Sequence, residues 1–182
     1  MVAEEEVRAL VARIVDELSG AESDERRPSV AIGADHGGFD LKQALAGHLR
    51  DRGYTVRDCG THGPESVDYP DFAHDVAKLV GSGECRWGVI VDGAGIGSCM
   101  VANKVPGVRA ALCYDLSSAR NSREHNHANV LTLGAGLIGP SLARQILDVW
   151  LETPWGPGRH AARVEKITAV EAGYLAAREA RR

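Results

Sequence analysis

The segment GVIVDGAGIGS at residues 88–98 carries the clearest chemical signal in the sequence. An apolar run ends in Asp92 and passes directly into three alternating glycines, Gly93, Gly95 and Gly97. A turn of this kind leaves backbone N–H groups pointing outward beside a carboxylate, which suits chemistry on a small anionic molecule. Asp92 is therefore a candidate general base beside amides that stabilise an oxyanion, and its structural alternative is the N-cap of the next helix.

A second polar group follows the apolar run VAIGA at residues 30–34. Here Asp35 and His36 precede the glycines Gly37 and Gly38. An aspartate in this position often closes a turn, and glycine allows a tight passage into a helix. Equally, His36 could bind an anion at the helix N-terminus while Asp35 contacts a sugar. The spacing leaves both interpretations open.

Basic side chains form two further candidate sites. His125 lies at the predicted end of a helix, where the helix dipole itself favours histidine, so a structural role is as open as a functional one. His125 and His127 are two residues apart, which does not favour joint metal binding from a helix, and no other spacing indicates a metal cluster. Arg159 and Arg163 share one side of the last predicted helix and could together hold a phosphate, although a solvated face is the ordinary alternative.

Alternating strand and helix signals position these residues. Short apolar runs predict strands at 30–34, 54–59, 88–92, 108–113 and 129–134, and helical patterns occupy 39–53, 70–81, 95–104, 116–125, 140–152 and the region from 159. This order predicts an α/β fold with a doubly wound (Rossmann-like), mainly parallel five-stranded sheet and helices on both faces. Ligands of such sheets bind beyond the carboxyl ends of the strands. We therefore expect the polar residues that follow the strands to gather at one edge, including Asp35-His36, Cys59-Gly60, Asp92-Gly93, Tyr114-Asp115 and Gly134-Ala135.

The composition is that of one globular domain with an appendage. The 182 residues are 44% hydrophobic and 25% charged, and the net charge of −4 without a long basic run argues against a nucleic-acid partner. No apolar stretch approaches the length of a membrane span, and the acidic N-terminus does not indicate export. The four cysteines lack CxxC spacing and lie in or near apolar segments, so we expect a reducing cytoplasm.

Residues 1–29 differ from the domain predicted at 30–182. An amphipathic helix is indicated by apolar residues at helical spacing, and the polar stretch SGAESDERRPS that follows predicts a flexible linker; the apolar residues are Val7, Leu10, Val11, Ile14, Val15 and Leu18. This segment resembles the encapsulation peptides that recruit enzymes into bacterial microcompartments, which implies a shell protein as partner. The alternative is a helix that packs on its own domain or on a dimer partner.

Six segments between Val30 and Ile167 form a linked set: ADHGGFDLK, SVDYPD, GVIVDGAGIG, ANKVPGVRAALC, REHNHANVLTLG and GRHAARVEKI. Together, in this order and at compatible spacing, they resemble the ribose-5-phosphate isomerase B family, which includes galactose-6-phosphate isomerase subunits. The resemblance implies an aldose–ketose isomerase that acts on a phosphorylated sugar through a cis-enediolate, without metal or cofactor. It also implies a homodimer or tetramer whose active sites are shared between subunits.

The resemblance further implies a role for each matching residue. Asp35 would contact the sugar and, with His125, assist ring opening, while Asn126 would bind sugar hydroxyls. The loop from Gly93 to Gly97, which includes Gly95 and Ile96, would supply amides to the enediolate oxygens. The phosphate would be held by basic side chains, with an aromatic residue nearby; these are His36, Arg159 and Arg163, with Tyr69. In the family the histidine at the position of His125 and the arginines come from the neighbouring subunit.

Two departures from the family pattern affect the chemistry. The position of Asp92 is a cysteine in many members, and the alternative glutamate base falls where this chain has Ser98, so Asp92 is the candidate base by position. An arginine that often binds phosphate is replaced by Gly136, a loss of about 1.5–3 kcal/mol unless Arg120 or Arg123 compensates. The preferred sugar phosphate, with four to six carbons, is therefore open. A non-catalytic sugar-phosphate-binding relative is the alternative function.

Overall fold

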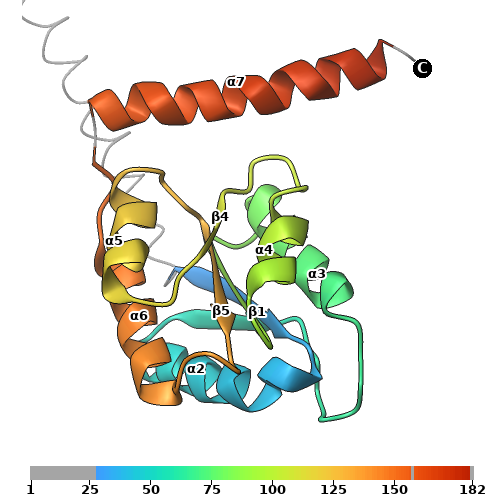
Figure 1. Ribbon diagram of the computed structural model, residues 1–182, viewed down its shortest axis with the longest axis vertical. Helices are drawn as coiled ribbons and strands as arrows, with labels where there is room; N and C mark the ends of the chain where they lie inside the picture. Colours follow the sequence, from blue (N-terminus) through green and yellow to red (C-terminus); the bar gives the residue numbers. More distant parts are fainter. Residues whose placement is uncertain (1–27, 157, 181–182) are drawn as a thin grey trace, which may run out of the picture.

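The computed structural model describes residues 28–156 and 158–180, which form a parallel α/β fold (Figure 1). The strands are β1 (Ser29–Ala34), β2 (Thr55–Asp58), β3 (Trp87–Asp92), β4 (Ala110–Leu112) and β5 (Val130–Gly134). The helices are the short η1 (His36–Gly38), α2 (Phe39–Asp51), α3 (Tyr69–Gly81), α4 (Ile96–Ala102), α5 (Leu116–Glu124), α6 (Pro140–Glu152) and α7 (Arg159–Glu179). None of these described helices is both long and apolar enough to cross a membrane.

The five strands form one sheet in the order β2-β1-β3-β5-β4, and all neighbouring pairs are parallel. From β1 the chain passes to β2 on one side of the sheet. From β3 it passes to β4 at the opposite edge, and β5 then lies between β3 and β4, so the topology switches between β1 and β3. Ala34 lies opposite Val91, and Asp92 lies opposite Gly134. The residues that follow β1, β3 and β5 are therefore neighbours at the end of the sheet that we call the carboxyl edge. The opposite end, where the strands begin, is the amino edge.

Alternating side chains of the strands build two apolar layers, as the two-residue period of a strand requires. Val30, Ile32 and Val89 face α2, α5 and α6, where Leu45 and Trp150 are fully buried. Ala31 and Ile90 point to the other face and pack against α3 and α4. The central strands are buried on both faces, which explains their near-continuous apolar sequences.

The predicted fold class is confirmed, and the strand and helix order follows the sequence pattern closely. One difference is β4, predicted at 108–113 but restricted to Ala110–Leu112. Its start is delayed because Val108 closes a turn by donating its amide to the Val105 carbonyl at 3.2 Å. The predicted N-terminal helix and most of its linker fall outside the described residues.

Helix α7 stands apart from the α/β body and lies along its amino edge, at the top of Figure 1. Val164 is its only buried residue among those described, and its link to the body includes Glu171, which accepts the Gly107 amide at 3.0 Å. Several large apolar side chains of the helix are exposed, namely Ile167, Val170, Tyr174 and Leu175. An uncovered apolar helix face is unusual in a protein that functions as a single copy.

Candidate active site

At the carboxyl edge, Asp35 and His36 follow β1 and begin the short helix η1. The Asp35 carboxylate accepts the Gly38 amide at 2.9 Å, which makes Asp35 the N-cap of η1. The Nδ1 atom of the exposed His36 lies 3.2 Å from the backbone of Val67. The predicted turn is therefore present, and it leaves the second Asp35 oxygen and the His36 Nε2 atom without a partner among the described residues.

The carboxylate of Asp92 is held inside the glycine loop that follows β3. One oxygen accepts the amides of Ala94, at 2.8 Å, and Gly95, while the other accepts the amide and hydroxyl of Ser98, the amide at 3.1 Å. Asp92 is only 5% exposed, and Ser98 is fully buried. The N-cap of α4 is Gly95 rather than Asp92, because the loop needs one residue at a positive φ of 76° before the helix starts.

The carbonyl groups of the same loop are also bound. Ala135 donates its amide to the Asp92 carbonyl at 2.8 Å, and Gly136 donates to Gly93 at 2.9 Å. The hydroxyl of Tyr114 donates to the Ala94 carbonyl at 2.7 Å. Tyr114 was predicted to lie at this edge but not to support the loop, because a hydroxyl–carbonyl contact between residues 20 positions apart leaves no local sequence signal.

Three amides of the loop, those of Gly93, Ile96 and Gly97, have no hydrogen-bond partner among the described residues. The Tyr69 ring covers Gly97 so closely that a Cβ atom there would lie 2.5 Å from the ring. Only glycine therefore fits beneath Tyr69. The loop is thus a rigid frame that offers free N–H donors next to an aromatic ring.

A buried lysine from α2 fixes the segment that leads from β2 to Tyr69. The ammonium of Lys42 donates to both oxygens of Asp58, at 2.7 and 2.9 Å, and to the Thr61 carbonyl at 2.8 Å. Thr61 in turn donates its amide to Ala34, directly before Asp35. Burial raises the pKa of Asp58, but the hydrogen bonds from Lys42 and Gly60 outweigh it, and the pKa is lowered. Lys42 was not predicted as part of the site. It shares a helix face with Leu45 and Leu49, but a lysine in such a place usually keeps its charged tip in water.

At the amino edge, α5 ends in His125, which is the C-cap of that helix. The Nδ1 atom of His125 lies 2.8 Å from the Asn121 side-chain amide, and Asn126 also contacts Asn121, at 3.3 Å. The imidazole of His125 stacks on that of His160, with 4.1 Å between the ring centres and 5° between the planes. The Nδ1 atom of His160 is buried and has no hydrogen-bond partner within residues 28–156 and 158–180.

The segment that follows α6, residues 153–156, crosses the end of α5 at this edge. Trp155 stacks on His127 with ring centres 4.2 Å apart, and Gly156 donates its amide to the Glu124 carbonyl at 2.9 Å. These contacts and the His125–His160 stack fix the start of α7. The exposed Arg159 and Arg163 lie on its first turns, four residues apart on one side as predicted.

Cations dominate the inner part of the amino edge. Arg123 is buried between Trp87 and Trp150, with its guanidinium 4.0 and 5.0 Å from the ring centres, and burial lowers its pKa to about 10. Partial burial and the neighbouring Arg109, Arg123 and Arg86 likewise lower the pKa of His127. Partial burial and the adjacent His125 have the same effect on the pKa of His160.

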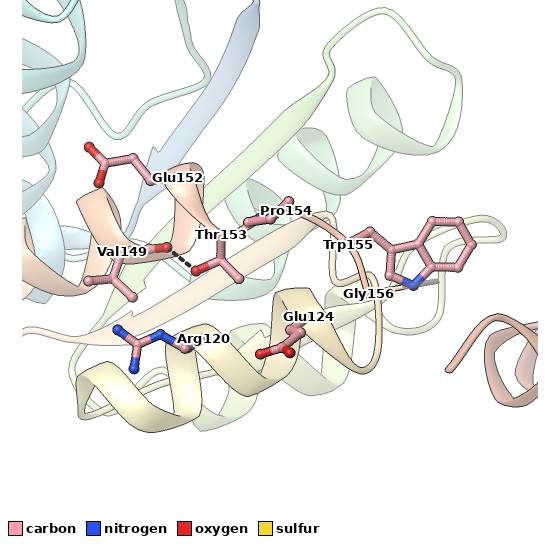
Figure 2. A pocket seen from close by; sticks show the side chains of 8 residues that line it. All are labelled: Arg120, Glu124, Val149, Glu152, Thr153, Pro154, Trp155 and Gly156. Atoms are coloured by element: carbon pink, nitrogen blue, oxygen red, sulfur yellow. Dashed lines mark hydrogen bonds between the residues drawn. The ribbon is translucent and has the colours of Figure 1, made fainter. Parts of the chain in front are cut away.

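A cavity of about 540 Å³ also opens at this end of the molecule, between α5, α6 and the crossing segment (Figure 2). Arg120 and Glu124 line one side, and Trp155 and Glu152 extend from the other. Within one chain, neither Arg120 nor Arg123 lies near Gly136, where the family often has an arginine. Gly136 lies against Gly93 at the carboxyl edge, whereas Arg120 lines this cavity and Arg123 is enclosed by two tryptophans.

The predicted site residues therefore form two groups. The carboxyl edge brings together Asp35, His36, Tyr69, Asp92, Gly93, Gly95, Ile96 and Gly97, and the amino edge carries His125, Asn126, Arg159 and Arg163. The five residues of β5 separate the two edges by about 16 Å. No group of three histidine, cysteine, aspartate or glutamate side chains in the described ranges could hold a metal ion.

Comparison with known proteins gives consistent matches over most of the chain. The sequence matches the family Ribose/Galactose Isomerase over residues 30–167. Ribose-5-phosphate isomerase B of Escherichia coli (strain K12) is 45% identical over 142 residues, which are 78% of this chain and 95% of that protein. D-erythrulose-4-phosphate isomerase of Pectobacterium atrosepticum is 44% identical over 141 residues, covering 76% and 92%.

Solved structures agree with these sequence matches. Ribose-5-phosphate isomerase B of Clostridium thermocellum superposes with a TM-score of 0.79 at 53% identity, covering 80% of this chain and 99% of that one. The enzyme of the same name from Mycoplasma genitalium, solved with bound ribulose-5-phosphate, gives a TM-score of 0.77 at 37% identity, covering 79% and 96%.

Proposed function

Because this chain belongs to the ribose/galactose isomerase family, we propose that it interconverts the aldose and ketose forms of a phosphorylated sugar through a cis-enediolate. The carboxyl edge carries this proposal, since it places carboxylates beside a loop with free amides at Ile96 and Gly97. Enolisation needs both parts: a base takes a proton from carbon, and fixed N–H donors stabilise the negative oxygen that forms.

We propose a substrate with four to six carbons and a terminal phosphate. The two relatives described above are named for a five-carbon and a four-carbon sugar phosphate, and both are about equally similar to this chain. His36 is the phosphate ligand supplied by the carboxyl edge, and the Tyr69 ring lies beside the reacting carbons. Measured turnover of four-, five- and six-carbon sugar phosphates ranks the substrates directly.

The enzyme works, in this proposal, as a homodimer or a higher assembly of dimers in which the amino edge of one copy meets the carboxyl edge of another. Arg159 and Arg163 then complete the phosphate site, Asn126 binds sugar hydroxyls, and His125 assists ring opening together with Asp35. Two observations support this arrangement. Arg159 and Arg163 lie at the amino edge, away from the Asp35 carboxylate of their own chain, and α7 leaves its apolar face uncovered.

Proton exchange with solvent tests the proposed activity. Incubation with ribose 5-phosphate and a panel of other sugar phosphates in D₂O is expected to exchange the C2 proton of the aldose for deuterium, as followed by ¹H NMR. The competing function is a sugar-phosphate-binding protein without catalysis. Binding in calorimetry without any exchange, across the whole panel, would establish that alternative.

Residues 1–29 are proposed to attach the enzyme to a microcompartment shell protein, within the cytoplasm. The amphipathic pattern of residues 7–18 and the polar linker after it support the attachment, and the four free thiols support the cytoplasm. A fusion of residues 1–29 to a reporter is expected to co-purify with shell proteins. Failure to co-purify, or loss of turnover on deletion of these residues, would instead favour a helix that packs on the enzyme itself.

A further inference from the structure

The proposed isomerisation needs one group that moves a proton between two neighbouring carbons, and two carboxylates lie close to the glycine loop. They are Asp35, after β1, and Asp92, at the end of β3. Because Ala34 and Val91 are partners in the parallel β1–β3 ladder, the two aspartates leave adjacent strands side by side. Their carboxylate oxygens have different hydrogen-bond partners, and this difference decides which aspartate can accept the proton.

Every acceptor position of Asp92 is used by the protein. Its two oxygens receive four hydrogen bonds, from the amides of Ala94 and Gly95 and from the amide and hydroxyl of Ser98. A carboxylate offers about four lone-pair positions, so none is left for a substrate proton. If Asp92 took that proton, a buried donor of the loop would lose its partner, which is unfavourable.

Asp35 keeps one oxygen free. Its Oδ1 atom accepts the Gly38 amide at 2.9 Å, and its Oδ2 atom has no donor in the part of the chain that the structure describes. The half-buried Asp35 also faces the glycine loop. A Cβ atom built on Gly37 would lie 3.4 Å from Asp35 Oδ1 and 3.8 Å from the Gly93 nitrogen, so Gly37 separates the carboxylate from the loop by little more than one methyl group.

We infer that Asp35 is the base that moves the proton, and that Asp92 is a positioning residue that holds the loop amides in place. This inference rests on the proposed function. Starting from the ketose, Asp35 takes a proton from C1, and the electrons of the C–H bond form the C1–C2 double bond. The carbonyl electron pair moves to O2, which becomes the enediolate oxygen. Asp35 then returns the proton to C2, while the O1 proton passes to O2 through water, which leaves an aldehyde at C1.

The test uses ketose phosphates that cannot form a ring. In ribulose 5-phosphate and erythrulose 4-phosphate, the hydroxyl that would close a five-membered ring either carries the phosphate or is missing. Exchange of the C1 proton with D₂O therefore reports enolisation alone and does not depend on ring opening. The role in ring opening that the family resemblance gives to Asp35 cannot then account for a defect.

Asp35→Asn is expected to slow this exchange about 10²- to 10⁴-fold, the usual contribution of a general base, while calorimetry shows unchanged binding of the ketose phosphate. Asparagine is as good an N-cap as aspartate, so η1 is retained. Asp92→Asn is expected to lower the unfolding temperature and to keep exchange within about tenfold of the wild type, because it weakens the loop rather than the proton transfer. Asp40→Asn, on the exposed first turn of α2, is the matched control.

Gly37→Ala gives an independent measurement without changing a charge. The added methyl makes only ordinary contacts with Asp35 and Gly93, so the protein should fold, but the space between carboxylate and loop is filled. Exchange is expected to fall at least tenfold, whereas Gly139→Ala, where a Cβ atom meets nothing within 4 Å, should leave it unchanged.

Three outcomes would overturn the inference. Exchange by Asp35→Asn within tenfold of the wild type removes Asp35 as the base. If Asp35→Asn loses both ketose binding and exchange, Asp35 is assigned to binding alone. Absence of exchange by the wild type on every sugar phosphate refutes the proposed function itself, and this result is distinct from the first two because it needs no substitution.

Discussion

The two edges of the sheet are built by different physical means. At the carboxyl edge, backbone groups and buried polar side chains bind one another, as in the four bonds to Asp92 and the three bonds of the Lys42 ammonium. At the amino edge, rings lie face to face, and the arginines of α7 extend into solvent. One edge is thus rigid and provides carboxylates, and the other provides cations and imidazoles. In the proposed assembly, a complete site combines both edges, each contributed by a different copy.

Mixing two inactive variants tests this division most severely. Asp35→Asn damages the carboxyl edge, and the double change Arg159→Ala/Arg163→Ala damages the amino edge. Each variant alone is expected to lose about 10²- to 10⁴-fold in kcat/KM. Random mixing of subunits should restore about one quarter of wild-type activity, because half of the dimers are mixed and each has one intact site. Absence of recovery after verified subunit exchange would show that both edges serve the same chain.

The rigidity of the carboxyl edge depends on Lys42. Lys42→Met is expected to lower the free energy of unfolding by about 3 kcal/mol, the lower end of the cost of breaking a buried ion pair, because Asp58 is 22% exposed to water. Urea unfolding measures the change. Lys78→Met is the matched control, since its ion pair with Asp75 is on the surface and should contribute less than about 1 kcal/mol. Equal effects of the two substitutions would refute a buried anchor at this edge.

The chemistry assigned to the amino edge can be separated from enolisation by the choice of substrate. His125→Asn is expected to reduce kcat about 10²-fold on ribose 5-phosphate, which is a closed ring in solution. The same variant should act on erythrulose 4-phosphate nearly as well as the wild type, since no ring has to open. A similar loss on both substrates would place His125 in proton transfer at carbon rather than in ring opening.

The smallest expected effect concerns the pH dependence of the amino edge. The pKa of His127 is lowered from its ordinary value of 6.5, so below that pH the unfolded chain binds a proton that the folded chain does not. The contribution of His127 to the free energy of unfolding is therefore fully present above pH 6.5. It falls as the pH decreases from 6.5 towards the lowered pKa of the folded chain. His127→Gln should reduce the difference in unfolding temperature between pH 7.5 and 5.5 by about 1–2 °C. An unchanged difference would show that the Trp155–His127 stack does not sense protonation.

The sequence allowed much of the carboxyl edge to be predicted, because parallel strands bring the residues that follow them to one place. Asp35 and Asp92 were expected to meet there, and they do. The hydrogen bonds that occupy the acceptor positions of Asp92 were not predicted. The pattern DGAGIGS does not specify whether the carboxylate faces the substrate or its own loop. Only the observed turn, with Gly95 at positive φ, directs it inward.

The amino edge was less accessible to prediction. The stacks His125–His160 and Trp155–His127 join residues about 30 positions apart, and no periodicity encodes a ring contact over that distance. The burial of Lys42 was hard to predict for a different reason, because a lysine on an apolar helix face usually keeps its tip in water. Its carboxylate partner, Asp58, lies on another element. In both cases the missing information was the identity of the distant partner.

The way α7 is attached separates the roles of its two ends. The arginines lie at the start of the helix, directly after the segment fixed by the ring stacks, whereas the match to the family ends at residue 167. The remaining part of α7, as far as Glu179, extends about 18 Å further and carries the exposed Val170, Tyr174 and Leu175. Substitutions in this distal part can therefore change which surface covers the helix while the arginines at its start keep their positions.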